Sequence, residues 1–447
     1  MTKRNGQPNT RLIPTYATLD EWIAGEAITF AVDSPTSFNA AVDQLVASLG
    51  DAVELLGFGE ALHGGEEILH LRNRLFQRLV EAHGYSAIAV ESSFPRGRSI
   101  NDYVLGRTGR SAAVSYEAVQ ENGFSHGFGR LEANRDLVEW MRRYNAGPAQ
   151  RTKLHFYGFD SPTEMTSSDS PRQVLHVALD YLTSLDSASG QAYRQRIDPL
   201  LGQDADWENP AVAFDPTKGI GRSAAATQLR IETEELIAEL QVRRPELVAK
   251  SDEARYREAA HHAVVARQLL TYHAVLAQAS SDRIARLLGM RDAMMADNLA
   301  YMVAREHGRG KVFVFAHNSH LQRGKAHWQL GPDLLIWWPA GAQLTELLGP
   351  RYAVIGSAVG VSEANGLGQP AAGTIEALLA AAPGPVRLIP THKGQGLPTS
   401  AIAALPVRTG SVKNSTYFAL TPQSLTDFDW LVLLDVATYA RGGPPLP

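Results

Sequence analysis

The sequence predicts an α/β fold with a mostly parallel central sheet flanked by helices, and a large α-helical insertion that forms one wall of a cleft. Two observations support this prediction. In the first and last thirds of the chain, short apolar runs of strand length alternate with helical segments, which is typical of parallel sheets. Between residues 170 and 307 the strand-like runs disappear and only helical periodicity remains.

The chain is expected to divide into three sections. Residues 1–165 are predicted to form the first half of the α/β core, residues 166–308 a helical cap, and residues 309–447 the second half of the core. A length of 447 residues with 44% hydrophobic residues is sufficient for one such large unit. The polar residues 1–30 are predicted to form an arm that lies over the body.

Each element is predicted from the period of its apolar residues, which is helical in some segments and continuous in buried strands. The first section is expected to contain helices over residues 37–49, 66–83 and 131–144, and strands over residues 53–58, 87–90 and 154–160. The cap is expected to contain helices over residues 174–185, 224–243, 252–279 and 281–306. The last section is expected to contain strands over residues 311–316, 352–356 and 428–435.

Composition excludes several classes of function. A formal net charge of −5 and a pI near 6.3 provide no basic surface for nucleic acid. The chain has no cysteine, which excludes disulfides, thiolate nucleophiles and cysteine-type zinc sites. No apolar run approaches membrane-spanning length, and the first residues lack the apolar core of a signal peptide. We therefore expect a cytoplasmic protein that acts on a small molecule, without nucleic-acid or membrane partners.

The stretch over residues 53–67 is the most informative part of the sequence. An apolar strand reaches Gly59, and Glu60, His63 and two glycines follow before a helix begins. Ligands of open α/β sheets bind at the carboxyl ends of the strands, where Glu60 and His63 are expected. A histidine can act as general base on water, and a nearby carboxylate can orient its ring. The alternative interpretation is that Glu60 caps the helix and His63 is a turn residue.

Three further side chains are expected at the same edge of the sheet. Glu91 follows the second strand, and we expect it beside Glu60 and His63 because consecutive parallel strands often neighbour each other. His317 and His320 follow the most apolar strand of the chain. The alternatives are a helix cap or a satisfied buried acid for Glu91, and a structural role for a single histidine.

An arginine and a group of lining residues complete the predicted site. Arg72 lies on the helix after the first strand and could point at the carboxylates or at a substrate oxyanion, although a solvated position is the default for a single arginine. Arg291 and Met295 lie one turn apart on one helical face. The predicted substrate-binding residues are Tyr103, Phe124, His126, Phe128, Asp160, Arg291 and Met295.

Two other kinds of site fit the sequence less well. The G-x-S-x-G nucleophile elbow matches residues 123–127 with Ser125 as nucleophile, but residues 120–122 are a poor end for the strand that this motif requires. Glutamate–histidine pairs such as Glu60 and His63 could in principle bind a metal. Because this pair lies on a strand-end loop and not on bundle helices, we expect no metal and no cofactor.

Taken together, these motifs resemble the erythromycin esterase family. The resemblance rests on Gly59-Glu60-Ala61-Leu62-His63-Gly64, on the helix with Arg72, on Ile88-Ala89-Val90-Glu91 with an aromatic residue and a proline after it, and on Phe315-Ala316-His317-Asn318-Ser319-His320. It spans most of the chain, including the helical middle section. The joint occurrence of the motifs in this order is specific.

The resemblance implies hydrolysis of a macrolide lactone ester without a serine nucleophile or an obligate metal. In such enzymes the motif histidine is the general base on water, which implies this role for His63, with Glu60 orienting it. The paired histidines are His317 and His320, which would bind or polarise the substrate. Together with Arg72, they would also stabilise the oxyanion. The strand-end glutamate of the family corresponds to Glu91, so the implied catalytic residues are Arg72, Glu91, His317 and His320 in addition to His63 and Glu60. The implied fold is an α/β core with a helical part along one wall of a cleft.

The sequence departs from the family pattern in the predicted pocket. Leu62 stands where threonine or serine is usual, and residues 123–128 stand where macrolide-cleaving members carry a tryptophan-rich stretch. The same acid–base groups also suit a non-hydrolytic lactonisation, elimination or isomerisation of secondary metabolism. A binder that leaves its ligand unchanged is a third hypothesis.

Overall fold

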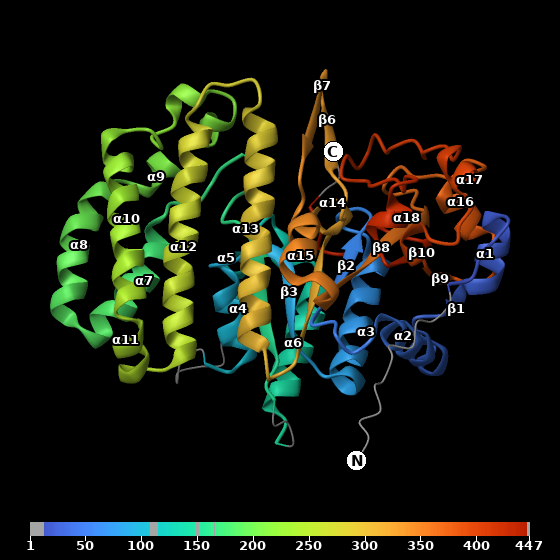
Figure 1. The fold of residues 1–447 in the computed structure, drawn as a ribbon, viewed down its shortest axis with the longest axis horizontal. Coiled ribbons are helices and arrows are strands. Elements are labelled where there is room, and N and C mark those ends of the chain that lie inside the picture. Colours follow the sequence, from blue (N-terminus) through green and yellow to red (C-terminus); the bar gives the residue numbers. More distant parts are fainter. Residues whose placement is uncertain (1–12, 108–114, 149–151, 165, 445–447) are drawn as a thin grey trace, which may run out of the picture.

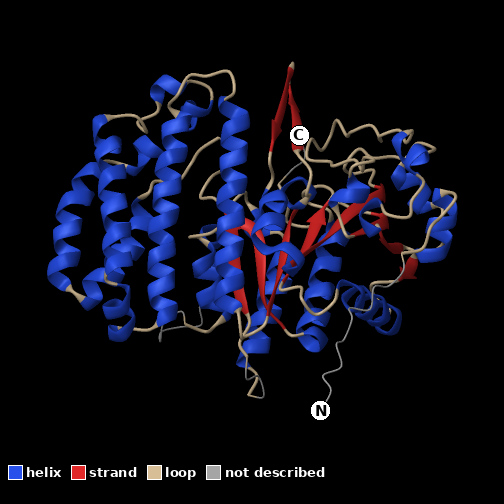
Figure 2. Cartoon of the chain, in the orientation of Figure 1, coloured by secondary structure: helices blue, strands red, loops and turns tan. Residues whose placement is uncertain are grey.

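The computed structural model describes residues 13–107, 115–148, 152–164 and 166–444. It is built around an eight-stranded sheet with helices on both faces (Figures 1 and 2). The strands of this sheet are β1 (Ile28–Phe30), β2 (Leu55–Glu60), β3 (Tyr85–Ser93), β4 (His155–Asp160), β5 (Lys311–His317), β8 (Tyr352–Val361), β9 (Val386–Pro390) and β10 (Trp430–Val436). They follow the order β1-β9-β10-β8-β2-β5-β3-β4, and only the pairs β1–β9 and β9–β10 are antiparallel. The prediction of a mostly parallel sheet flanked by helices is confirmed.

Burial on both faces explains why the central strands read as continuous apolar runs. Every residue of β2 and β3 is buried. One face packs against α2 (Pro35–Leu49), α3 (Glu66–His83) and α6 (Glu132–Ala146). The opposite face packs against α13 (Arg283–Glu306) and α15 (Ala340–Leu348). The sheet is therefore sandwiched between two helical layers.

A block of long helices lies at one end of the molecule, with α13 between this block and the sheet (Figure 1). Its members are α7 (Arg172–Leu185), α8 (Ser187–Leu201), α10 (Ala224–Val242), α11 (Arg244–Lys250) and α12 (Glu253–Leu276). Their apolar sides share one hydrophobic core with that face of the sheet. The block matches the helical middle section, while the predicted section boundaries at residues 165 and 308 stay a prediction. Among the described helices, none is both long and apolar enough to cross a membrane.

Short elements fill the connections. The remaining helices are α1 (Leu19–Glu26), α4 (Gly97–Val104), α5 (Glu117–Gly123), α9 (Asp204–Trp207), α14 (Asn318–Leu321), α16 (Ile375–Ala380), α17 (Thr399–Ala403) and α18 (Ser424–Asp427). Strands β6 (Ala326–Leu330) and β7 (Asp333–Trp337) form a separate hairpin that projects from the body (Figure 1). The prediction of an arm is wrong for residues 19–30, which form α1 and the edge strand β1; residues 1–12 lie outside the described residues.

The connections that follow β2 and β5 lie on opposite faces of the sheet. After β2 the chain enters α3 on one face, and after β5 it enters α14 and α15 on the other face. Neighbouring parallel strands with diverging connections leave a crevice at their carboxyl ends, which is where α/β proteins bind ligands. Glu60 and His317 are register partners at this edge.

One detail of the predicted topology is wrong. We expected β2 and β3 to be neighbours because they are consecutive in the chain, but β5 lies between them. Glu91 nevertheless lies close to Glu60 and His63, where it was expected. The insertion brings His317 between the two predicted carboxylates. The sequences of β2 and β3 do not indicate that a strand more than two hundred residues later in the chain lies between them.

Candidate active site

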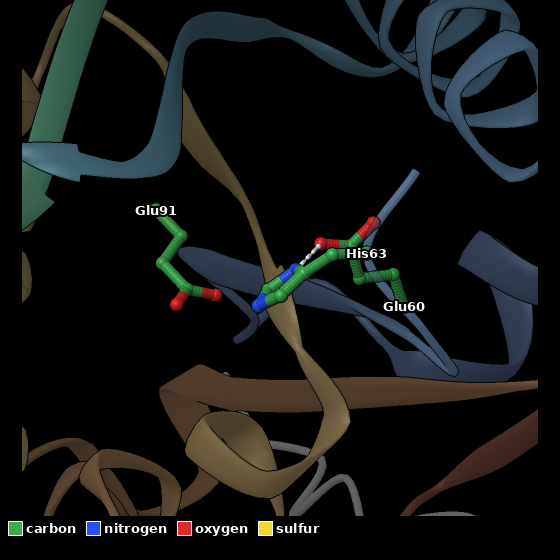
Figure 3. A group of neighbouring side chains, drawn as sticks. All are labelled: Glu60, His63 and Glu91. Atoms are coloured by element: carbon green, nitrogen blue, oxygen red, sulfur yellow. Dashed lines mark hydrogen bonds and ion pairs between the residues drawn. The ribbon is translucent and has the colours of Figure 1, made fainter. Parts of the chain in front are cut away.

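The turn after β2 presents a hydrogen-bonded acid and histidine. Nδ1 of His63 lies 2.6 Å from Oε1 of Glu60. A carboxylate only accepts hydrogen bonds, so Nδ1 carries the proton and Nε2 presents its lone pair. Figure 3 shows this second ring nitrogen pointing toward Glu91. The turn itself is fixed by the His63 N–H, which donates to Oγ1 of Thr416 at 3.0 Å, and by Gly64 at a φ of 77°.

His63 is the member of this group that solvent reaches. Its side chain is 28% exposed, whereas the Glu60 side chain is 5% exposed. Burial lowers the pKa of His63, but the negative charges of Glu60 and Glu91 outweigh burial and the pKa is raised above the usual 6.5. Burial is also the main influence on Glu60, whose pKa is raised although His63 and Arg72 oppose the shift.

Glu91 is a buried carboxylate held by three donors. Its Oε2 accepts the backbone N–H of His317 at 2.8 Å, and its Oε1 lies 3.1 Å from Nη2 of Arg291 and 3.4 Å from Nε2 of His320. Burial raises the pKa of Glu91, but the charges of His320, His63 and Arg291 lower it well below its ordinary value. Glu91 is therefore ionised throughout the neutral range.

The His317 ring uses both nitrogens within the protein. Nε2 lies 2.6 Å from the carbonyl oxygen of Thr416, and since a carbonyl only accepts, Nε2 carries the proton. Nδ1 lies 2.7 Å from Oγ of Ser319. Burial and the nearby His63 lower the pKa of His317 to about 3, so the ring is neutral. Its ring centre lies 5.1 Å from that of His63, so His317 forms one wall for the base.

His320 is the cationic counterpart of His317. Its Nδ1 lies 2.8 Å from Oδ1 of Asp292, and its Nε2 faces Glu91. Burial lowers the pKa of His320, but the two carboxylates outweigh burial and raise it to about 10. All four ring nitrogens of His317 and His320 have partners within the protein. The prediction that these histidines bind or polarise the substrate is therefore not supported by a free ring N–H.

A second network joins predicted pocket residues around Asp160, the last residue of β4. Asp160 accepts two hydrogen bonds from Arg291, at 2.9 Å from Nε and 2.6 Å from Nη2, and lies 3.3 Å from Nε2 of His126. Burial lowers the pKa of His126, but Asp160 and Glu164 raise it to about 9. The Phe128 ring lies 5.4 Å from the ring of His63 and 5.7 Å from that of His126. The structure therefore brings these four predicted lining residues to the cluster, and the predicted Phe124 lines a small cavity beside Glu60 and Glu91.

Arg72 is buried behind this group instead of facing solvent. Its side chain is 1% exposed, and its Nε and Nη2 donate to Oδ1 of Asn73 at 3.0 and 2.7 Å. The guanidinium lies 4.8 Å above the ring of Phe315. Burial lowers its pKa to about 10, which leaves it charged at neutral pH. It lies too deep to contact a substrate oxyanion directly.

One group of described residues has the donor atoms for a metal. Oxygen and nitrogen atoms of Glu60, His63 and Glu91 lie within 4.8 Å of one another. This donor set suits a divalent transition ion. However, both oxygens of Glu91 already accept hydrogen bonds, and the Arg291 guanidinium beside them repels a cation. The residues therefore fit a metal poorly.

A larger cavity lies elsewhere, between the outer side of α3 and the ends of β9 and β10. It has a volume of about 710 Å³, and its lining includes Glu67, His70, Arg74 and Val386. Large cavities are the usual first choice for a ligand site. The cluster of Glu60, His63 and Glu91 is the stronger candidate site, because shifted pKa values and converging polar atoms occur there.

Three residues considered in the sequence lie away from the exposed face of His63. The hydroxyl of Tyr103 donates to Glu139 in the core, and Met295 is fully buried under the helical layer. Ser125 follows a helix, not a strand, and its Oγ accepts the N–H of Ser93 at 3.0 Å. Within the described residues, Ser125 hydrogen-bonds to Ser92 and Ser93 and to no histidine, so the nucleophile-elbow interpretation has no geometric support.

Comparison with known proteins connects this geometry to a family. The model of the erythromycin esterase family matches residues 80–437. The chain belongs to this family. Erythromycin esterase type II of Escherichia coli is 22% identical over 338 residues, which cover 75% of this chain and 76% of that protein. The resemblance predicted from the sequence motifs is confirmed, and as an erythromycin esterase family member the protein is a carboxylic ester hydrolase.

Solved structures share the fold of this esterase. A Bacillus cereus protein superposes with a TM-score of 0.73 at 18% identity and covers 95% of this chain and 98% of its own. A succinoglycan biosynthesis protein gives 0.68 at 18% identity, with the same coverage. An erythromycin esterase variant in its open conformation gives 0.66 at 19% identity, covering 93% of this chain and 98% of its own. At these identities the likeness establishes the fold alone.

Sequence reasoning missed several residues that shape the candidate site. Asp292 holds His320 and also accepts the indole N–H of Trp337 at 2.6 Å, which ties the base of the β6–β7 hairpin to the site. Thr416 contacts both His63 and His317 from a loop without regular structure. Asp292 is adjacent to Arg291 in the sequence, which is the one signal that could have indicated it.

Proposed function

We propose that the protein hydrolyses an ester or a macrolide lactone, with His63 as the general base on water and without a metal. The single observation that carries the proposal is the orientation of His63. Its Nδ1 is fixed on Glu60, while its Nε2 points toward Glu91 from a partly exposed ring. The erythromycin esterase family and the Escherichia coli relative support a lactone substrate.

In this mechanism water attacks the carbonyl carbon while its proton passes to Nε2 of His63. The negative charge of Glu60 stabilises the imidazolium that forms and keeps the ring in the productive tautomer. When the tetrahedral intermediate collapses, the C–O bond to the alcohol breaks and His63 returns the proton to the leaving oxygen. The products are a carboxylic acid and an alcohol, and His63 is neutral again.

The charge that develops on the carbonyl oxygen needs a positive environment. The cations around His63 are Arg291, protonated His320 and protonated His126, whereas Arg72 is enclosed by the protein. We therefore transfer the expected oxyanion role from Arg72 to the field of Arg291 and His320. Glu91 anchors both groups and also lies next to the place of the attacking water.

The decisive experiment is a panel of macrolides and small lactones incubated with the protein in heavy-oxygen water and an excess of chelator. We expect at least one compound to gain one water, with the heavy oxygen in the new carboxylate, detected by mass spectrometry. A reaction without water gain would support lactone formation, elimination or isomerisation instead. Loss of the reaction on chelation would contradict metal independence.

The raised pKa of His63 predicts the pH dependence of the reaction. The base must be neutral to accept a proton, and its pKa lies above the usual 6.5 because Glu60 and Glu91 outweigh burial. We expect kcat/KM to increase with pH through an apparent pKa above 6.5 and to level off on the alkaline side. Measuring kcat/KM across this range tests the prediction; a rate that falls as pH rises from 6 to 8 would contradict it.

A further inference from the structure

A small cavity lies between the buried groups that support His63. It has a volume of about 20 Å³, and its polar lining residues are Glu60, Arg72, Glu91 and Asn134. The rest of its wall is formed mainly by apolar side chains, among them Leu69, Val90, Phe124, Leu131 and Phe315. One water molecule needs roughly 10–15 Å³ of such space, so the cavity has room for one water and no larger ligand.

Arg72 and Glu60 attract each other across this cavity without touching. The negative charge of Glu60 acts on Arg72 and the positive charge of Arg72 acts on Glu60, yet no ion pair or hydrogen bond joins them. The hydrogen bonds of Arg72 within the described residues come from Nε and Nη2, and that of Glu60 is accepted by Oε1. Nη1 of Arg72 and Oε2 of Glu60 are therefore available to a water in the cavity that both residues line.

Asn134 adds an unsatisfied acceptor. It is 4% exposed, and its Nδ2 donates to the carbonyl oxygen of Phe128 at 2.8 Å, which fixes the orientation of the amide. Its Oδ1 has no hydrogen-bond partner among the described residues. Buried polar atoms without partners are uncommon in proteins, and ordered water is the usual partner when protein groups are out of reach.

We propose that one ordered water occupies this cavity and links Arg72 to Glu60, with Asn134 as its third partner. The water accepts a hydrogen bond from Nη1 of Arg72 and donates its two hydrogens to Oε2 of Glu60 and Oδ1 of Asn134. Each of these three atoms then has the water as a partner, and the water has three partners, the usual number for a buried water. This water is distinct from the attacking water, because His63 does not line the cavity.

The bridge gives Arg72 and Asn134 a function as positioning residues, which rests on the proposed function of His63 as base. Hydrogen bonds to the ionised form of a carboxylate stabilise that form. The bridge therefore keeps Glu60 negative in a buried place. Loss of the water should therefore reduce the negative charge beside His63 and lower the pKa of His63.

A crystal structure of the unmodified protein, at a resolution that reveals ordered water, is the first test. We expect one density peak within hydrogen-bond distance of Nη1 of Arg72, Oε2 of Glu60 and Oδ1 of Asn134. In the Asn134→Leu variant the acceptor is lost and the peak should disappear. A direct Arg72–Glu60 ion pair, or a cavity without density in the unmodified protein, would overturn the proposal.

The second test follows the protonation of His63 by NMR in histidine-labelled protein, with His63→Asn used to assign the signal. In Asn134→Leu the pKa of His63 should decrease by roughly one unit, the lower end of the effect of a nearby opposite charge. The matched control is Asn145→Leu on the same helix, where the amide bonds Val104 and Leu154 and does not line the cavity. An unchanged His63 pKa in Asn134→Leu, or an equal shift in both variants, would refute the bridge.

These two tests separate the bridge from the esterase mechanism, because neither requires turnover. Water density and a shifted His63 pKa in a protein that hydrolyses nothing would leave the bridge standing and remove the proposed function. Hydrolysis by a protein whose cavity lacks water would do the reverse.

Discussion

Replacement of His63 by alanine should reduce kcat for ester hydrolysis by roughly 10²–10⁴-fold, the contribution of a positioned general base. The variant retains the cations around the site, because Arg291 and His320 are held by Asp160, Glu91 and Asp292 and not by His63. Substrate binding should therefore change little, so that the loss appears in kcat and not in KM. Steady-state kinetics on the substrate found in the lactone panel measures both constants.

The matched control for this prediction is His70→Ala. His70 lies on α3, its side chain is 44% exposed, and it lines the larger cavity instead of the cluster around His63. Its replacement should leave kcat within a factor of about two, since exposed surface changes have small effects. Because the His63 side chain is partly open to solvent, added imidazole should restore part of the activity of His63→Ala and none in His70→Ala. A loss of less than tenfold in His63→Ala would exclude His63 as the base.

The sequence predicted the central strands because each is buried on both faces and so is apolar throughout. The runs before Glu60, Glu91 and His317 match β2, β3 and β5, with boundaries that differ by a few residues. The short strands β1, at the edge of the sheet, and β9, beside it, were missed. β9 contains an arginine and ends in proline, so it has no run of apolar residues long enough to stand out. The hairpin of β6 and β7 was missed as well, although its turn contains Gly331 and Pro332.

The acid–base residues were predictable because their chemistry is local in sequence. Glu60 and His63 share one turn, and the position after a buried strand places Glu91 and His317 at the same edge. What could not be predicted was which helical residues face this edge. Periodicity assigned Arg291 and Met295 to one face, yet Arg291 reaches Glu91 while Met295 is enclosed in the core.

The partner charges were also beyond the reach of the sequence. Whether an arginine is solvated or buried depends on elements far away in the chain, as Arg72 demonstrates: its neighbours include the carbonyl of Ala133 on α6. The same holds for Asp292, whose partners His320 and Trp337 arrive from two later segments. Polar networks in a core are therefore visible only after the strand order is known.

Replacement of Arg291 by methionine should destabilise the protein by about 3–5 kcal/mol, the cost of removing one partner from a buried ion pair. Arg291 is the shared partner of Asp160 and Glu91, whose side chains are 0% and 5% exposed. Methionine fills a similar volume but leaves both carboxylates with fewer donors. The midpoint of thermal or urea unfolding measures the effect, and activity should fall with it because Glu91 anchors the site.

The control for this variant is Arg98→Met. Arg98 pairs with Glu258 at 3.0 Å, but its side chain is 49% exposed, so water replaces the pair and the loss should be about 0–1 kcal/mol. Comparable losses in the two variants would show that the buried position of Arg291 confers no special stability. A double variant, Arg291→Met with Asp160→Asn, removes one orphaned charge and should recover part of the stability.

The pH dependence of the Arg291→Met effect follows from Asp160. Burial raises the pKa of Asp160, but Arg291 and His126 outweigh burial and lower it below 3.8. The stability that comes from this lowered pKa is present above 3.8 and is lost as pH falls through the folded-state value. Without Arg291 the pKa of Asp160 is no longer lowered by that cation. This contribution to stability is then absent at neutral pH, and little of it can be lost in acid. The difference in unfolding midpoint between the two proteins should therefore shrink as pH falls below 3.8. A difference that stays constant well below pH 3.8 would indicate that lost packing, and not the unpaired carboxylates, causes the destabilisation.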